Sequence, residues 1–187
     1  MSISETIKRR RATPPRFLKE EDISKETIMQ LLESANWAPN HKKTEPWRFK
    51  IYIGDAKQKL AEDIHRFLMD KAKTEKIVVP NKVDKLKTNL EHVPVVMIVL
   101  MQRDEAQRLP EWEEIAAVSM AVQNMWLAAT EMGLGAFWAT PQFMSLLENM
   151  LGVEPGQKAL GFFYLGKLAM EYPSPGRGAI ESKVEWH

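Results

Sequence analysis

The chain has 187 residues, 44% of them hydrophobic, which is enough to bury one substantial core, so we expect residues 1–187 to form a single domain. The 26 lysines and arginines against 25 aspartates and glutamates leave a net charge of +1, which disfavours nucleic acid and anionic membranes as partners. The chain has no cysteine, which excludes thiolate catalysis, disulfides and cysteine-ligated metal sites, and it shows neither a signal-peptide pattern nor a membrane-length apolar run, so we expect a soluble, cytoplasmic protein.

The first part of the chain predicts two helices and a strand. Ser2 with Glu5 matches a capping box, so a short helix opens the chain and ends before the double proline at 14–15. A second helix is expected over about residues 24–38, where apolar side chains recur at helical spacing. Residues 47–53 then alternate apolar and polar side chains, which predicts a strand with one buried face.

The middle of the chain predicts a third helix, an irregular segment and an interior strand. Asp55 with Gln58 is expected to cap the third helix. Residues 71–90 are rich in lysine and interrupted by Pro80, so we expect a mobile or loosely helical excursion there, of the kind that forms a lid. Residues 93–101 are almost continuously apolar and rich in β-branched side chains, which predicts a strand at the centre of a sheet.

The last part predicts one long helix, two strands and an extended tail. Residues 111–132 are apolar on nearly every side, so this helix is expected to be buried, and a second subunit is one means of burying it. Strands at 135–140 and 158–168 enclose a helix that begins at Pro141. The tail, 171–187, is rich in proline and glycine yet ends on apolar residues, so it should be extended and docked. The elements lack regular βαβ alternation and indicate an α+β fold.

Most catalytic motifs are missing from the sequence. It contains no nucleophile elbow, no phosphate-binding P-loop and no dinucleotide-binding glycine loop after a strand. The four histidines are scattered without the spacing of metal ligands. If the protein is an enzyme, its reactive group is therefore expected to come from a cofactor, and we assign no catalytic residue and no metal ligand.

Three short clusters could hold a ligand, and each has an ordinary structural alternative. The three arginines at 9–11 suit a phosphate clamp, or else a solvated helix end where cations offset the helix dipole. His41 with the lysines at 42–43 lies between a helix and a strand, where it could grip a ligand or be a polar turn. Trp138 and Thr140 end a strand, where an indole can wall a binding site or join the core.

Taken together, the ordered motifs resemble the nitroreductase-type FMN flavoproteins, and among them the short, minimal members. The resemblance runs from about residue 3 to the C-terminus, and it is carried by "IKRRRAT", "APNHKKTEPWRF", "AVQNMWLAATEMGLGAFWAT", "GFFYLGK" and "RGAIESKVEW". It implies an α+β fold with a central, mostly antiparallel sheet flanked by helices. It also implies an intertwined homodimer whose FMN sites are built from both subunits.

The resemblance implies how the FMN phosphate is held. Arg10 and Arg11 match the family's paired arginines at the phosphate and ribityl end, with Ala12 in place of the usual serine. If Arg9 and Arg10 are the pair instead, the serine position is Arg11. Arg177 falls where many members place a tail residue that completes the phosphate site.

The resemblance also implies residues around the flavin ring. His41 matches a histidine that reaches the flavin from the partner subunit, and Trp37 occupies a position where some relatives carry a basic residue. Trp138, Ala139 and Thr140 match the segment that runs beside the isoalloxazine, and Thr140 keeps the hydroxyl of that segment.

The implied activity is hydride transfer from NAD(P)H through FMN to an electron-poor acceptor such as a nitroaromatic, a quinone or an activated alkene. The acceptor and the choice between NADH and NADPH stay open. Two alternatives remain: a protein of the same fold that fragments, stores or senses flavin, and a non-enzymatic module that uses the basic "KRRR" and "HKK" clusters to bind an acidic partner.

Overall fold

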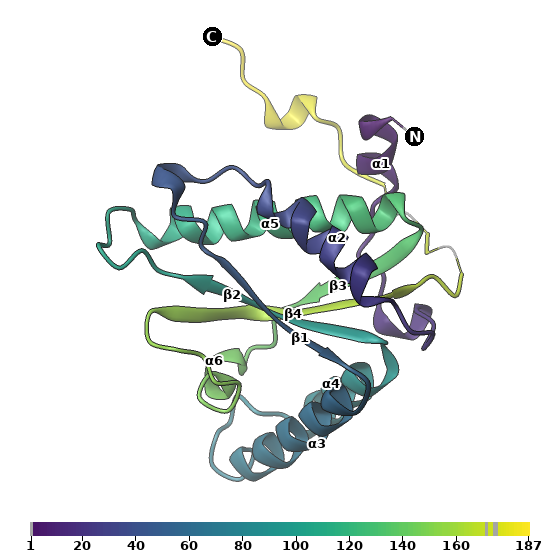
Figure 1. The fold of residues 1–187 in the computed structure, drawn as a ribbon, viewed down its shortest axis with the longest axis vertical. Helices are drawn as coiled ribbons and strands as arrows, with labels where there is room; N and C mark the ends of the chain where they lie inside the picture. The colour runs from purple at the N-terminus through teal and green to yellow at the C-terminus, as the bar shows by residue number, and fades with distance from the viewer. Residues whose placement is uncertain (1, 171, 174–175) are drawn as a thin grey trace.

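The computed structural model describes residues 2–170, 172–173 and 176–187, and it is built on one antiparallel sheet (Figure 1). The strands lie in the order β1 (Trp47–Ile53), β2 (Val95–Gln102), β4 (Gln157–Lys167) and β3 (Leu134–Ala139), and every neighbouring pair is antiparallel. The helices are α1 (Ile3–Arg9), α2 (Lys25–Asn36), α3 (Gly54–Lys71), α4 (Pro80–His92), α5 (Glu111–Glu131) and α6 (Met144–Leu147). The expected α+β class, with an antiparallel sheet between helices, is confirmed.

The helices cover both faces of the sheet (Figure 1), with α2 and α5 on one face and α3, α4 and α6 on the other. Successive side chains of β2 point to opposite faces of the sheet, and helices cover both faces, so β2 is buried on both of its sides. Val95, Met97 and Val99 join the core under α2 and α5, whereas Val96 and Ile98 join the core over α3 and α4. The prediction that this apolar segment forms the centre of the sheet is confirmed.

Helix α5 is buried along one side only in this chain. Val118, Ala121 and Met125 are fully buried against α2 and the sheet. Trp112 and Met120 are exposed large apolar side chains on the same helix. Helix α5 therefore has an apolar surface beyond what this chain covers. Among the helices of the described residues, none is both long and apolar enough to cross a membrane.

The segment after α3 differs from its prediction. Pro80 begins α4 rather than interrupting a helix, because the first helical position needs no backbone N–H. Val83, Leu86 and Leu90 are buried at helical spacing and pack α4 onto the sheet and α3. The expectation of a loose excursion is therefore wrong for residues 80–90, and only the turn between α3 and α4 is irregular.

Two further sequence expectations are corrected by the structure. Helix α3 begins at Gly54, and no side chain caps it, so the capping role given to Asp55 is wrong. Gly54 has a φ of 52°, which redirects the chain from β1 straight into the helix. The helix expected after Pro141 is a single turn, α6, followed by turns as far as Gly152.

The C-terminal tail is extended but not docked on its own chain. Residues 176–187 are exposed, with one short 3₁₀ turn, η3 (Glu181–Lys183), and Figure 1 shows them running out past α1 and α5. Trp186 is 92% exposed, and Ile180 and Val184 are exposed as well. The predicted docking is thus wrong within a single chain.

Candidate functional site

Three arginines meet beside α5, and we call Arg10, Arg11 and Arg177 the arginine corner. Arg10 ends α1, and its guanidinium lies 4.8 Å from the ring centre of Trp126 on α5. The three arginines line a pocket of about 380 Å³, together with Gln123 and neighbouring residues of α1. The structure therefore brings two distant parts of the chain, the N-terminal arginines and the tail arginine, to one place.

The arginine corner carries uncompensated positive charge. In the part of the chain that the structure describes, Arg10, Arg11 and Arg177 form no ion pair with a carboxylate; Arg11 and Arg177 donate only to backbone carbonyls. Burial lowers the pKa of Arg10, and the charges of Arg177 and Arg11 lower it further. Because a guanidinium stays charged in proteins, an anion placed here would relieve this repulsion.

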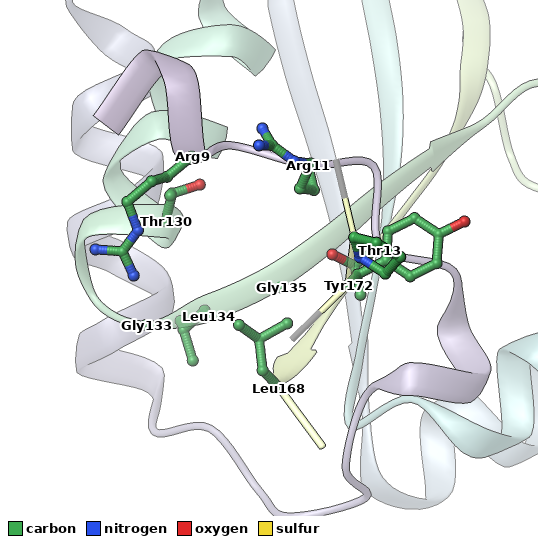
Figure 2. Close-up of a pocket in the computed structure, with 10 residues that line it drawn as sticks. Arg9, Arg11, Thr13, Thr130, Gly133, Leu134, Gly135, Leu168 and Tyr172 are labelled. Atoms are coloured by element: carbon green, nitrogen blue, oxygen red, sulfur yellow. The ribbon is translucent and has the colours of Figure 1, made fainter. Parts of the chain in front are cut away.

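A second pocket borders the same arginine segment (Figure 2). Its volume is about 410 Å³, and it is lined by Arg9, Thr13, Thr130 and Tyr172 among others, with Arg11 bordering both pockets. Figure 2 shows Arg9 and Thr130 on one side of it and Thr13 and Tyr172 on the other. Arg9 is thus not among the residues that line the pocket of Arg177. This grouping favours Arg10 and Arg11, rather than Arg9 and Arg10, as the pair.

The segment after Arg11 runs beside β3 and links the arginine corner to the end of that strand. Ala12 forms a parallel bridge with Ala136, and the Thr13 N–H donates to the Ala136 carbonyl at 2.8 Å. Ala12 is exposed and brings no hydroxyl, so the serine contact usual at this position is missing. The strand then leads to Trp138 and Ala139 at its C-terminal end.

A larger pocket opens at that end of β3, and we call it the β3-end pocket. It has a volume of about 680 Å³ and is lined by residues 14–16, one side of α4, residues 137–143 and Tyr164. Trp138, Ala139 and Thr140 all contribute to it. The predicted ring-binding segment therefore does border a cavity of the size that small ligands occupy in proteins.

Two residues at this end of the sheet carry a polar atom that lacks a partner. Within the described residues, the Tyr164 hydroxyl and the Trp138 Nε1 are buried and have no hydrogen-bond partner. Tyr164 is completely buried, and burial raises the pKa of its hydroxyl, which therefore stays protonated at neutral pH. A buried donor without a partner costs stability. Both atoms are closed off from the pocket in this structure, because Tyr164 lies in the core over α3 and α4 and Trp138 packs against the core under α2 and α5.

A bulge in β4 shapes this end of the sheet. Val99 pairs with Gly161 and Leu100 pairs with Ala159, so Leu160 is an extra residue in β4. Gly161 has a φ of 131°, and a Cβ atom on it would lie 2.3 Å from the Ala139 carbonyl oxygen. Only glycine lets β4 pass this close to the end of β3, which sets the position of the ring-binding segment.

His41 and Trp37 lie elsewhere in this chain. The His41 Nδ1 lies 2.9 Å from a carboxylate oxygen of Glu113, at the start of α5, and the His41 side chain is 59% exposed. Trp37 is 79% exposed and donates to Glu33 at 2.9 Å. With a rise of about 1.5 Å per residue, Glu113 lies about 20 Å along α5 from Trp126. A single chain therefore does not bring His41 to the arginine corner.

Several pocket residues were missed by the sequence reasoning. They are Arg16, Lys82, Lys85, Gln123 and Tyr164. Lys82 and Lys85 are one helical turn apart, but this signal is useful only once residues 80–92 are recognised as a regular helix. Tyr164 reads as an ordinary core residue of a buried strand, and only the structure reveals its unpartnered hydroxyl.

Comparisons with known proteins identify the family. The family model "Nitroreductase family" matches residues 7–167. YfhC of Bacillus subtilis, whose name provisionally assigns it as an NAD(P)H nitroreductase, is 35% identical over 129 residues, which is 69% of this chain and 65% of YfhC. The matched stretch thus spans less than two thirds of that relative.

Solved structures share the whole fold. A nitroreductase-like family protein from Bacillus cereus has a TM-score of 0.82 and 28% identity, and the match covers 100% of this chain and 96% of that chain. A provisionally named nitroreductase from Desulfovibrio desulfuricans, in complex with FMN, has a TM-score of 0.77 and 22% identity over 100% of this chain and 98% of its own, which shows likeness of fold alone. By the family match over most of its length, the chain belongs to the nitroreductase family.

Proposed function

We propose that this protein is an FMN-dependent oxidoreductase that passes hydride equivalents from NAD(P)H to an electron-poor acceptor, and that residues 1–187 act as one domain in a homodimer. Family membership supports an oxidoreductase. The name of YfhC supports NAD(P)H as the donor, and the FMN complex of the Desulfovibrio protein supports the cofactor. The observation that carries the proposal is the arginine corner, joined by β3 to the β3-end pocket.

The described residues fit FMN at both of its ends. The phosphate is a dianion, and the arginine corner offers three guanidiniums that no carboxylate of the described chain neutralises. The β3-end pocket is lined by apolar side chains such as Phe137 and by the hydroxyl of Thr140, which suits an aromatic ring. Arg10, Arg11 and Arg177 would hold the phosphate, while Trp138, Ala139 and Thr140 would border the ring.

When bound, FMN would supply reversible two-electron chemistry that no side chain of this protein provides. The protein's own residues bind, orient and exclude water. Thr140 brings a hydroxyl to the edge of the pocket, where it would act as a hydrogen-bond donor or acceptor to the ring. No residue needs to form a covalent bond, so we assign none as catalytic.

A second copy of the chain would complete the site. His41 and Trp37 are exposed, and His41 is paired with Glu113 at the end of α5 that is remote from the arginine corner, so both would reach a flavin from the partner subunit. The exposed apolar residues of the tail and of α5 favour such an assembly, because exposed apolar area of this kind marks protein interfaces. The tail would then be docked on the partner.

The first experiment measures flavin content and turnover. We expect purified protein to bind FMN, shown by its visible spectrum after desalting, and to oxidise NAD(P)H faster when a nitroaromatic or quinone is added. Protein that binds FMN without such acceleration would favour a flavin-fragmenting, flavin-storing or flavin-sensing role. Protein that stays colourless after incubation with FMN would favour the non-enzymatic module.

Mixing two variants tests whether the site is shared. Arg10→Gln removes a proposed phosphate ligand from one subunit, and His41→Ala removes the proposed partner contribution. In a mixed dimer one of the two sites regains both wild-type residues, so activity should exceed that of either variant alone. Equal activity of the mixture and its parents, with subunit exchange verified by mass spectrometry, would argue against a site built from two subunits.

A further inference from the structure

Among the described residues, every charged residue that lines the β3-end pocket is a cation. In the described chain its charged lining residues are Arg16, Lys82 and Lys85, and none of them forms an ion pair with a carboxylate. Lys82 donates to the Gln142 side chain at 3.3 Å, and the Arg16 guanidinium lies over the Phe17 ring at 4.7 Å. The pocket therefore has three positive charges and no acidic group to offset them.

Helix α4 reinforces this positive potential. Lys82 and Lys85 lie near the N-terminus of a 13-residue helix, and its first turn has no acidic residue. A helix N-terminus carries a partial positive charge, so acidic residues are favoured there and lysines are not. Asp84 lies between the two lysines in sequence but pairs with His65 of α3, at 2.9 Å. The helix thus keeps its lysines on the pocket side at some cost to its own stability.

The cationic patch lies in the pocket proposed for the flavin ring. Arg16, Lys82 and Lys85 line the same cavity as Trp138 and Thr140, which border the proposed ring position. The pyrophosphate and the additional phosphate of NADPH belong to the part of that molecule remote from its nicotinamide. A charge patch inside the ring pocket is better placed for an anionic group attached directly to the ring that is reduced.

We propose that the acceptor is an electron-poor aromatic compound that carries a carboxylate, and that Arg16, Lys82 and Lys85 recognise this carboxylate; the inference rests on the proposed function. For a nitroarene the overall reaction balances as follows: NAD(P)H, one proton and the nitroarene give NAD(P)⁺, the nitrosoarene and one water. The nitro group gains two electrons and loses one oxygen atom as water, and the nicotinamide loses the two electrons. The carboxylate is unchanged and serves only in binding.

Binding of an unreactive probe tests the recognition directly. We compare benzoate with its neutral analogue benzamide by isothermal titration calorimetry, on wild-type FMN-loaded protein and on the double variant Lys82→Gln/Lys85→Gln. We expect the dissociation constant for benzoate to rise about tenfold in the variant, the loss of one charge-assisted contact, while that for benzamide changes less than about twofold. Lys25→Gln on α2, an exposed lysine on the opposite face of the sheet, is the matched control.

Turnover measurements and a charge-reversal variant distinguish a carboxylate on the acceptor from the phosphates of the nicotinamide donor. The ratio of kcat/KM for para-nitrobenzoate to that for para-nitrobenzamide should fall about tenfold in the double variant, and Lys85→Glu should move the preference towards a nitroaromatic with a quaternary ammonium group. Flavin reduction by NADPH, followed alone without acceptor, should keep its wild-type rate. Loss confined to that step would assign the lysines to the nicotinamide donor and overturn the inference.

The outcomes also distinguish this inference from the proposed function. Equal losses for charged and neutral probes would mean that the lysines support the pocket or the flavin rather than a carboxylate, and would overturn the inference. Unchanged benzoate affinity in the double variant would overturn it as well, while leaving the flavin proposal intact. Protein that retains no FMN and reduces no acceptor would instead contradict the proposed function.

Discussion

The arginine corner makes a sharp prediction about which part of FMN it holds. Arg10→Gln removes one of three guanidiniums that the described carboxylates leave uncompensated. A hydrogen bond to a charged group contributes about 1.5–3 kcal/mol, so we expect the dissociation constant for FMN to rise about 10- to 150-fold. Riboflavin lacks the phosphate, so its affinity should be nearly unchanged.

The assay is a fluorescence titration of flavin-free protein with FMN and with riboflavin. The substitution also removes the stacking of Arg10 on Trp126, which contributes about 0.5–1 kcal/mol and should lower Tm by about 1–4 °C. Arg66→Gln, an exposed arginine on α3, is the control and should change neither affinity. An equal loss of affinity for FMN and riboflavin, or no loss for either, would refute the assignment of the phosphate to this corner.

Three further predictions concern the framework around the site. Gly161→Ala should destabilise the protein by roughly 1–3 kcal/mol in urea unfolding and reduce FMN retention, because the φ of Gly161 is positive and the added Cβ would lie 2.3 Å from a β3 carbonyl oxygen. A stable variant that binds FMN fully would contradict this account of the bulge. Glu114→Ala should lower the free energy of unfolding by about 3–5 kcal/mol in the same assay, since it leaves Arg103 without its partner in a buried ion pair. A loss below about 1 kcal/mol would show that the pair is dispensable. Hydrogen bonds from the Arg108 side chain lower the pKa of Asp104 to about 2. The Tm of wild type should therefore exceed that of Asp104→Asn by its full amount at neutral pH, and this difference should vanish as pH falls from about 4 towards 2. A Tm difference independent of pH would exclude this linkage.

The candidate site residues came from the resemblance to the nitroreductase-type flavoproteins, because the residues alone left each cluster with an ordinary structural alternative. The structure places Arg10, Arg11 and Arg177 around one pocket. Trp138 and Thr140 were expected at a strand end, and they border a cavity there. Their roles toward FMN stay predictions, but their placement is consistent with those roles.

Other features depend on contacts that no local pattern reveals. His41 was expected either to grip a ligand or to belong to a polar turn, and in this chain it is exposed and paired with Glu113 at the start of α5. The tail was expected to dock, yet its apolar residues find no surface on their own chain. Both outcomes depend on which other surfaces these residues contact in the folded protein, and spacing along the sequence does not encode such contacts.

By itself, the sequence determined the elements whose signals lie within a few residues: the capped α1, the alternating β1, the continuously apolar β2 and the long α5. Tertiary structure alone decided that residues 80–92 form a packed helix, because their apolar side chains stabilise the helix only when they are buried against the sheet and α3. It also decided that the lysines of this helix and Tyr164 line one cavity. Residues so far apart in the chain become neighbours only when the antiparallel sheet and the helix beneath it are assembled.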